Sequence, residues 1–112
     1  MDLPTQLTFH DIERTEPLEA YVRMRAEKLP TFHSRILACR IALEAPHRHQ
    51  RHGRTYRVRI DLSVPGRELC VNRAAQKDVD LCAAIDDAFD HAARVLKEHN
   101  SRLHQHAGPA RE

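Results

Sequence analysis

The sequence predicts an α+β fold with the element order β-α-β-β-β-α, in which a four-stranded mixed sheet carries two parallel helices on one face. Three observations support this prediction. Apolar and polar residues alternate with a period of two in three segments, as in strands with one buried face. Apolar residues recur at helical spacing in one segment before these strands and in one after them. The 112 residues suffice for one domain with one modest core.

The first two elements are a short strand and a helix. Residues 5–9 alternate, with Leu7 and Phe9 on one face. Thr15 is a suitable N-cap, and Pro17 falls in the first helical turn, where its missing N–H does no harm. A proline disfavours the helical conformation in the residue before it, so we expect the helix to end at Pro30. The residues of its apolar stripe are Leu18, Val22, Ala26 and Leu29, with Tyr21 beside them.

Three further strands follow the helix. Residues 35–45 form the second strand, which Pro46 ends, and residues 55–64 form the third. Pro65 and Gly66 are a tight-turn signal, and residues 67–73 return as the fourth strand. We expect the inward-facing residues to be Leu37, Cys39, Ile41 and Leu43, then Tyr56, Val58, Ile60, Leu62 and Val64, and finally Leu69 and Val71.

A long helix closes the domain, from Val79 to about Leu103, with Asp78 or Asp80 as its cap. We therefore predict a single domain over residues 1–104 and a flexible tail over 105–112. The apolar stripe of this helix contains Cys82, Ile85, Phe89, Ala92, Ala93, Leu96 and Leu103.

The order of elements also predicts their arrangement. A right-handed crossover through the first helix makes strands one and two parallel neighbours, and strands two to four form an antiparallel meander. Because one face of the sheet is apolar, both helices must cover that face. Both then run antiparallel to strand two, so their C-terminal ends lie at the same end of the molecule.

The formal net charge of +2 indicates little by itself, so the distribution of charge matters more. Each helix is acidic in its first half and richer in base in its second half. Bases near helix C-termini complement the helix dipole, each contributing a few tenths of a kcal/mol. Cations from two parallel helices can also bind phosphates. The candidate RNA-binding residues are Arg23, Arg25, Lys28, Arg35, Arg94, Lys97 and Arg102.

The segment "HRHQRHGR" leaves three interpretations open: a metal site, a nucleic-acid contact or a solvated loop. His47 and His49 share one face of an extended chain, and His52 could fold back as a third ligand. The surrounding arginines repel a dication and no carboxylate lies nearby, so we predict no metal site. Arginine suits bidentate contact with phosphate, and histidine can stack on bases. The possible auxiliary RNA-binding residues are His47, Arg48, His49, Arg51, His52, Arg54, Arg57 and Arg59.

The sequence argues against several functional classes. It contains no apolar run near 18 residues and no secretory signal, so we expect neither membrane insertion nor export. Three cysteines without a CxxC pair indicate reduced thiols in a cytoplasmic protein. Cys39 and Cys82 fall on expected buried faces, and Cys70 lacks a histidine–carboxylate pair. We therefore predict no enzyme, no cofactor and no small-molecule substrate. Asp86, Asp87 and Asp90 are expected to be solvated or ion-paired on the helix surface.

Three stretches together resemble the family of ribosome hibernation promoting factors, also called ribosome-associated inhibitor A or protein Y. They are "EPLEAYVRMRAEKLPTFHSRI", "RVRIDLSVPGRELCVNR" and "DVDLCAAIDDAFDHAARVLKEHNSRL". The resemblance implies a fold like that of double-stranded-RNA-binding domains. It also implies binding to ribosomal RNA of the small subunit, in the channel of mRNA and tRNA, which silences translation in stress or stationary phase. The basic residues that carry over from the family are Arg25, Lys28, Arg35, Arg94 and Arg102.

The chain departs from the family pattern on the second helix, where His91, Glu98 and Asn100 stand in place of lysines. The cationic surface is thinner for that reason, and the arginine-rich loop could compensate. The resemblance is to the short form, which lacks a second domain, and we expect a monomer when free. Two alternatives do not involve the ribosome. One is a general RNA-binding module, and the other is a protein-interaction module that binds its partner through the arginine-lined sheet.

Overall fold

The structure is a computed structural model that describes residues 3–45, 55–75 and 79–107, with side chains described as far as Arg102. The expected loop residues 46–54 and the tail residues 108–112 lie outside this part. The elements in chain order are β1 (Thr5–His10), α1 (Glu16–Glu27), the 3₁₀-helix η1 (Leu29–Phe32), β2 (Ala38–Glu44), β3 (Arg57–Val64), β4 (Arg67–Ala74) and α2 (Leu81–Ala107).

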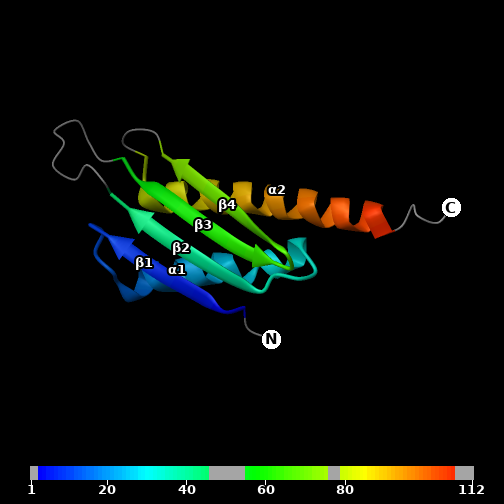
Figure 1. Cartoon of the computed structure of the whole chain (residues 1–112). Coiled ribbons are helices and arrows are strands. Elements are labelled where there is room, and N and C mark those ends of the chain that lie inside the picture. The colour runs from blue at the N-terminus through cyan, green and yellow to red at the C-terminus, as the bar shows by residue number, and fades with distance from the viewer. Residues whose placement is uncertain (1–2, 46–54, 76–78, 108–112) are drawn as a thin grey trace.

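The sheet has the predicted topology, with strand order β1-β2-β3-β4. β1 pairs with β2 in parallel, and β2, β3 and β4 form the antiparallel meander. Ile60 of β3 lies opposite Ile41 of β2 and Val71 of β4. Figure 1 shows α1 and α2 on the same face of the sheet, running in the same direction. The predicted fold class is thereby confirmed.

One core fills the space between the sheet and the two helices. Alternate residues of β2 and β3 are buried, as the period-two pattern predicts. From α1, Val22 and Ala26 contribute to this core, and from α2 mainly Ile85, Phe89 and Leu96. Full burial of a large aliphatic or aromatic side chain contributes about 1.5–3 kcal/mol, so this layer supplies most of the stabilisation.

Local sequence signals set the ends of several elements. The hydroxyl of Thr15 accepts a hydrogen bond from the Leu18 N–H at 3.3 Å, which caps α1 as predicted. The carboxylate of Asp80 accepts from the Cys82 N–H at 3.0 Å at the start of α2. Gly66, in the turn between β3 and β4, has a φ of +76°, a conformation that glycine adopts without strain.

Three predicted helix boundaries were wrong. The α-helix ends at Glu27 rather than at Pro30, and Pro30 instead lies inside η1. Proline is compatible with the start of a 3₁₀-helix because its missing N–H falls where no intrahelical partner is needed. The second helix begins at Leu81 rather than at Val79 and continues to Ala107, so residues 105–107, predicted to belong to the tail, are helical.

Two predicted core residues were also wrong. Leu37 precedes the first residue of β2 and is 53% exposed, although its N–H still donates to the Ser63 carbonyl at 2.7 Å. Alternation alone does not mark where a strand begins. Cys82 is exposed, because the buried stripe of α2 passes through Leu81, one turn before Ile85, instead. The predicted burial of Cys39 and the outward position of Cys70 are confirmed.

Candidate nucleic-acid interface

The junction between α1 and α2 is built around Arg25. Its guanidinium forms ion pairs with Asp86 and Asp90, each at 3.0 Å, and lies 5.6 Å from the ring centroid of Phe89. Tyr21, which is on α1 like Arg25, also donates a hydrogen bond to the carboxylate of Asp86 on α2. The Arg25 side chain is only 24% exposed. Arg25 therefore neutralises the acidic first half of α2 and fastens the two helices together.

The three aspartates of α2 behave as the sequence predicted, since all are ion-paired. Asp87 forms its pair with Arg73 of β4 at 3.0 Å. On α1, Glu19 lies 3.1 Å from Arg23 and 3.1 Å from Arg14. Hydrogen bonds from Arg14 and then Arg23 lower the pKa of Glu19. Arg23 and Arg25, two candidates for RNA binding, thus have acidic partners within the domain.

The Arg25 pairs yield a stability prediction. Arg25→Gln should lower the free energy of unfolding by about 1 kcal/mol, because two ion pairs between helices are lost at a partly buried site. Arg23→Gln is the matched control, since it removes one ion pair within a single helix and should have a smaller effect. Urea unfolding of both variants tests this. Equal losses would show that Arg25 does not join the helices.

The remaining candidate cations lie at or just after the end of α1 and from the middle of α2 onward. Lys28 is the C-cap of α1, and Arg35 follows η1. Both are exposed, as is Arg94, which lies four residues after Asp90 on α2. Within the described residues, none of these three has an acidic partner. Lys97 lies 5.2 Å above the Phe32 ring, and Arg102 is 3.9 Å from Glu98 in an exposed pair.

Contacts that the sequence did not predict bring Lys28 and Arg35, beside η1, close to the cations of α2. The N–H and hydroxyl of Ser34 donate to the amide oxygen of Asn100, at 3.0 and 3.1 Å. His33 and His99 lie in contact immediately beside them. Because η1 and its flanks pack on the second half of α2, the cations of both helices share one end of the domain. We call Lys28, Arg35, Arg94, Lys97 and Arg102 the cationic end.

His99 carried a signal that could have revealed this contact. It follows Leu96 by three residues, so it continues the buried stripe of α2. His33 carried no such signal, because it lies in the connection between η1 and β2, where no regular period applies.

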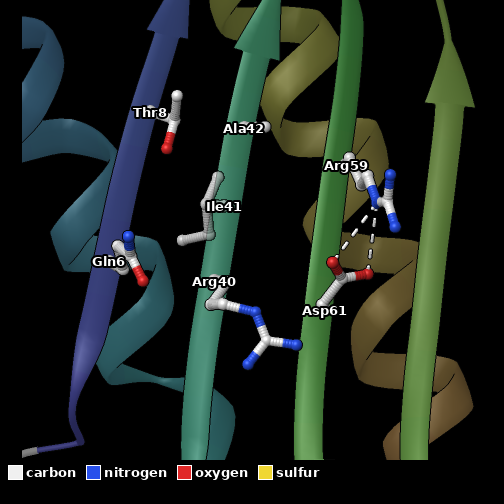
Figure 2. Close-up of a pocket in the computed structure, with 7 residues that line it drawn as sticks. All are labelled: Gln6, Thr8, Arg40, Ile41, Ala42, Arg59 and Asp61. Carbon is white, nitrogen blue, oxygen red and sulfur yellow. Dashed lines mark hydrogen bonds and ion pairs between the residues drawn. The ribbon is translucent and has the colours of Figure 1, made fainter.

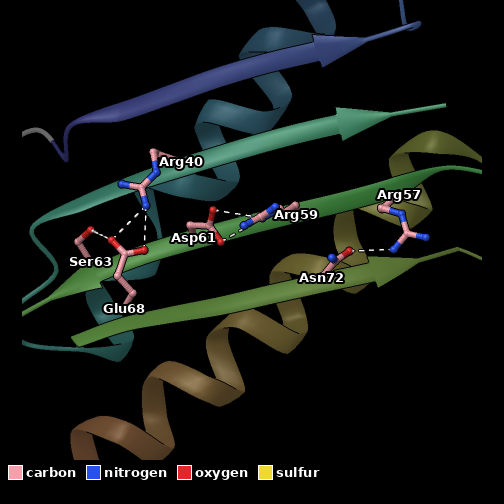
Figure 3. Close-up of polar contacts among 7 residues, drawn as sticks. All are labelled: Arg40, Arg57, Arg59, Asp61, Ser63, Glu68 and Asn72. Carbon is pink, nitrogen blue, oxygen red and sulfur yellow. Dashed lines mark hydrogen bonds and ion pairs between the residues drawn. The ribbon is translucent and has the colours of Figure 1, made fainter. Parts of the chain in front are cut away.

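The outer face of the sheet has a different electrostatic character. Arg40 contacts both carboxylate oxygens of Glu68, at 2.8 and 3.0 Å, and Arg59 pairs with Asp61 at 3.2 Å (Figure 3). Arg57 donates to the side-chain oxygen of Asn72 at 3.1 Å. Hydrogen bonds from Ser63 and then Arg40 lower the pKa of Glu68. Most of the positive charge on this face is therefore compensated locally.

A shallow hollow of about 200 Å³ lies on this face between β1, β2 and β3 (Figure 2). Arg40 and Arg59 stand at its border, and the small side chains of Thr8 and Ala42 form part of its floor. Arg57 and Arg59 are the only members of the predicted auxiliary RNA-binding set within the described residues. The other six, His47, Arg48, His49, Arg51, His52 and Arg54, lie outside them.

The thiols show no activation. Burial raises the pKa of Cys39 to about 12, and a hydrogen bond with Asp61 raises that of Cys70. Partial desolvation raises the pKa of Cys82, although this residue is exposed. In residues 3–45, 55–75 and 79–102, no three histidine, cysteine or carboxylate side chains are grouped so that they could hold a metal ion. Neither helix of the described chain has a stretch apolar enough to cross a membrane.

The fold and the sequence together define the class of this protein. Residues 5–104 match the family described as "Sigma 54 modulation protein / S30EA ribosomal protein". The match covers nearly the whole chain, and the chain belongs to this family.

Two relatives carry a more particular description. The chain is 34% identical over 98 residues to the ribosome hibernation promotion factor of Deinococcus radiodurans, covering 87% of this chain and 49% of the relative. It is 31% identical over 100 residues to the ribosome hibernation promoting factor of Salmonella typhimurium, covering 89% and 96%. The chain therefore spans about half the length of the first relative and nearly all of the second. The family expected from the sequence is confirmed.

Two solved structures share the fold. One is the N-terminal domain of Thermus thermophilus Protein Y, with a TM-score of 0.68 and 24% identity. The other is a ribosomal subunit interface protein from Coxiella burnetii, with a TM-score of 0.69 and 12% identity. Both comparisons cover 88% of this chain and 99% of the other. At these identities the likeness concerns the fold alone.

Proposed function

We propose that this protein is a cytoplasmic ribosome hibernation factor that binds ribosomal RNA of the small subunit and silences translation under stress. Family membership and the names of the two relatives support the ribosome as partner. The observation that carries the proposal is the cationic end, where two parallel helices present cations beside the tight junction of η1 and α2. Arginine and lysine so placed contact RNA phosphates and fix orientation rather than reading sequence.

We propose the cationic end as the principal RNA contact. Lys28, Arg35 and Arg94 have no acidic partner within the described residues, so little internal attraction must be broken before they meet phosphate. Arg25 acts mainly by holding the helices in place, because Asp86 and Asp90 already occupy its guanidinium. The arginines of the sheet are auxiliary at most, since Arg40 and Arg59 have carboxylate partners.

The location that we propose is the channel that mRNA and tRNA use. A factor bound there would exclude both ligands, which explains inhibition without any chemical reaction. Silencing would require only occupancy, so no catalytic residue or cofactor enters the mechanism.

Co-sedimentation with small ribosomal subunits across a salt series tests this function. Contact with about five phosphates should reduce affinity about 100-fold or more between 50 and 200 mM salt, because bound counterions are released on association. Large subunits are the control and should bind weakly. Protein that stays in the supernatant at low salt would refute the proposal. An affinity that does not change with salt concentration would indicate a protein-interaction module. An equal affinity for unrelated RNA would indicate a general RNA-binding module.

A competition experiment addresses the channel itself. Small subunits loaded with mRNA and tRNA should bind this protein less tightly than empty subunits at the same salt concentration. Equal affinity for loaded and empty subunits would place the contact outside the channel.

A further inference from the structure

His33 and His99 form a buried pair where η1 meets α2. His33 is 2% exposed and His99 is 8% exposed. Nε2 of His33 lies 2.8 Å from Nδ1 of His99, and the ring centroids are 5.1 Å apart with an interplanar angle of 15°. A buried hydrogen bond between two imidazoles depends on which ring nitrogens carry protons, so this pair responds to protonation.

The hydrogen bonds around the pair assign its tautomers. The backbone N–H of Arg35 donates to Nδ1 of His33 at 3.0 Å, so this nitrogen is an acceptor and the proton of His33 is on Nε2. Nε2 of His33 then donates to Nδ1 of His99, which places the proton of His99 on its own Nε2. In this arrangement both rings are neutral. Nε2 of His33 is the donor, and Nδ1 of His99 is the acceptor.

An additional proton would break a hydrogen bond in this arrangement. On Nδ1 of His99, the proton would face the N–H of His33. If the proton of His33 moved to Nδ1 to relieve that conflict, it would face the N–H of Arg35. Protonation therefore disrupts either the contact between η1 and α2 or the contact that orients His33.

The surrounding charges also oppose protonation. Burial lowers the pKa of His99, and Arg67 from β4 and Arg102 from α2 lower it further. Arg35 and Lys97 add positive charge on the two sides of the junction. Glu98, the neighbouring acid on α2, lies 3.9 Å from Arg102 in an exposed ion pair. The charges of Arg67 and Arg102 therefore both oppose protonation of His99.

We propose that His33 and His99 are a proton-sensitive latch, which holds η1 against α2 when neutral and opens on mild acidification. Opening would separate Lys28 and Arg35 from Lys97 and Arg102 and so weaken RNA binding; this second part rests on the proposed function, whereas the latch does not. The Ser34–Asn100 bonds and the Lys97–Phe32 contact lie at the same junction and would loosen with it.

The sign of the pH effect on stability follows from linkage. A histidine whose pKa is lower in the folded state than in the unfolded state stabilises the fold fully above its unfolded value, about 6.5. As the pH falls below that value, the unfolded chain takes up more protons and stability declines. RNA binding should decline in the same direction. General protonation of exposed histidines would strengthen binding to phosphate, so the latch predicts the opposite sign.

Histidine side-chain NMR on the ¹⁵N-labelled protein tests the latch in the unaltered chain. At pH 7.5, both rings should show the neutral Nε2–H tautomer. On acidification, His99 should titrate below the ordinary histidine value of about 6.5. An Nδ1–H tautomer, or titration at or above the ordinary value, would overturn the proposal.

The double variant His33→Gln with His99→Asn provides the complementary test. Gln places an amide near the position of Nε2 and Asn near that of Nδ1, so a hydrogen bond can persist without titrating. Between pH 7.5 and 5.5, the Tm of the unaltered chain should fall by about 5 °C more than that of the variant. His10→Gln, at an exposed position in β1, should follow the unaltered chain. Equal losses in all three proteins would overturn the latch, and His99→Asn alone serves where the double variant does not fold.

Ribosome binding at the two pH values tests the functional part. At fixed salt, acidification should weaken binding of the unaltered chain by about tenfold relative to the double variant, which is the effect of losing one hydrogen bond. If the Tm difference occurs without this change in affinity, the latch is supported and its link to RNA binding is overturned. Absence of ribosome binding at both pH values contradicts the proposed function, while the NMR and Tm results still decide the latch.

Discussion

Replacing Lys28, Arg35 and Arg94 together by glutamine is expected to weaken binding to the small ribosomal subunit by about 100-fold at physiological salt. Glutamine retains a polar, extended side chain, so the change removes charge with little change in packing. All three side chains are exposed, so the Tm should stay within a few degrees of the parent. The slope of log affinity against log salt should also decrease by about three.

A variant of the sheet provides a control of equal charge. Arg40, Arg57 and Arg59 are replaced by glutamine, which removes three charges from the opposite side of the domain. This control is stringent, because it leaves the carboxylates of Asp61 and Glu68 without their arginine partners. Its affinity should fall less than that of the helix variant. A larger loss in the sheet variant would move the principal contact to the sheet.

Phe89→Ala is expected to lower the free energy of unfolding by about 3–5 kcal/mol, the largest loss from any single substitution considered. The ring is 1% exposed and lies in the core, with the guanidinium of Arg25 against it. Truncation would leave a cavity and remove this contact from the Arg25 side chain. Urea unfolding of the purified variant measures the loss.

Met24→Ala is the control for this prediction, since Met24 is a large apolar residue of α1 that is 40% exposed. Its effect should lie within about 0.5 kcal/mol. A comparable loss in both variants would show that the core is not organised around Phe89.

Most of the fold could be predicted from periodicity and chain order. The alternation in β2 and β3 indicates burial on one sheet face, and a helix between two strands provides the long crossover connection that parallel pairing needs. Periodicity fails where a backbone changes conformation without a change in residue pattern. Leu37 continues the alternation of β2 by one step beyond the strand. Pro30 indicates that the α-helix ends nearby, but it reveals neither the end at Glu27 nor the 3₁₀ turn that contains Pro30 itself.

The candidate site was only partly predictable. Parallel helices with basic C-terminal halves indicated a cationic end, and residue type sufficed for that inference. The sequence could not separate Arg25 from Arg94, because the difference is one of geometry: Asp86 and Asp90 face Arg25 across the helix junction. The contact between His33 and His99 links residues far apart in the chain, and its hydrogen bonds depend on ring orientation that no sequence pattern encodes.

The strand pairing also bears on how the chain acquires its structure during synthesis. β3 and β4 join through the turn at Pro65 and Gly66, so their ends meet after closing a very short loop. β1 pairs with β2 only across α1 and η1, as in the register of Thr5 with Cys39. Loop closure is slower and entropically more costly over longer separations. The full parallel partner of β1 therefore exists only after Glu44 has been added, whereas β4 can pair with β3 as soon as it follows the turn.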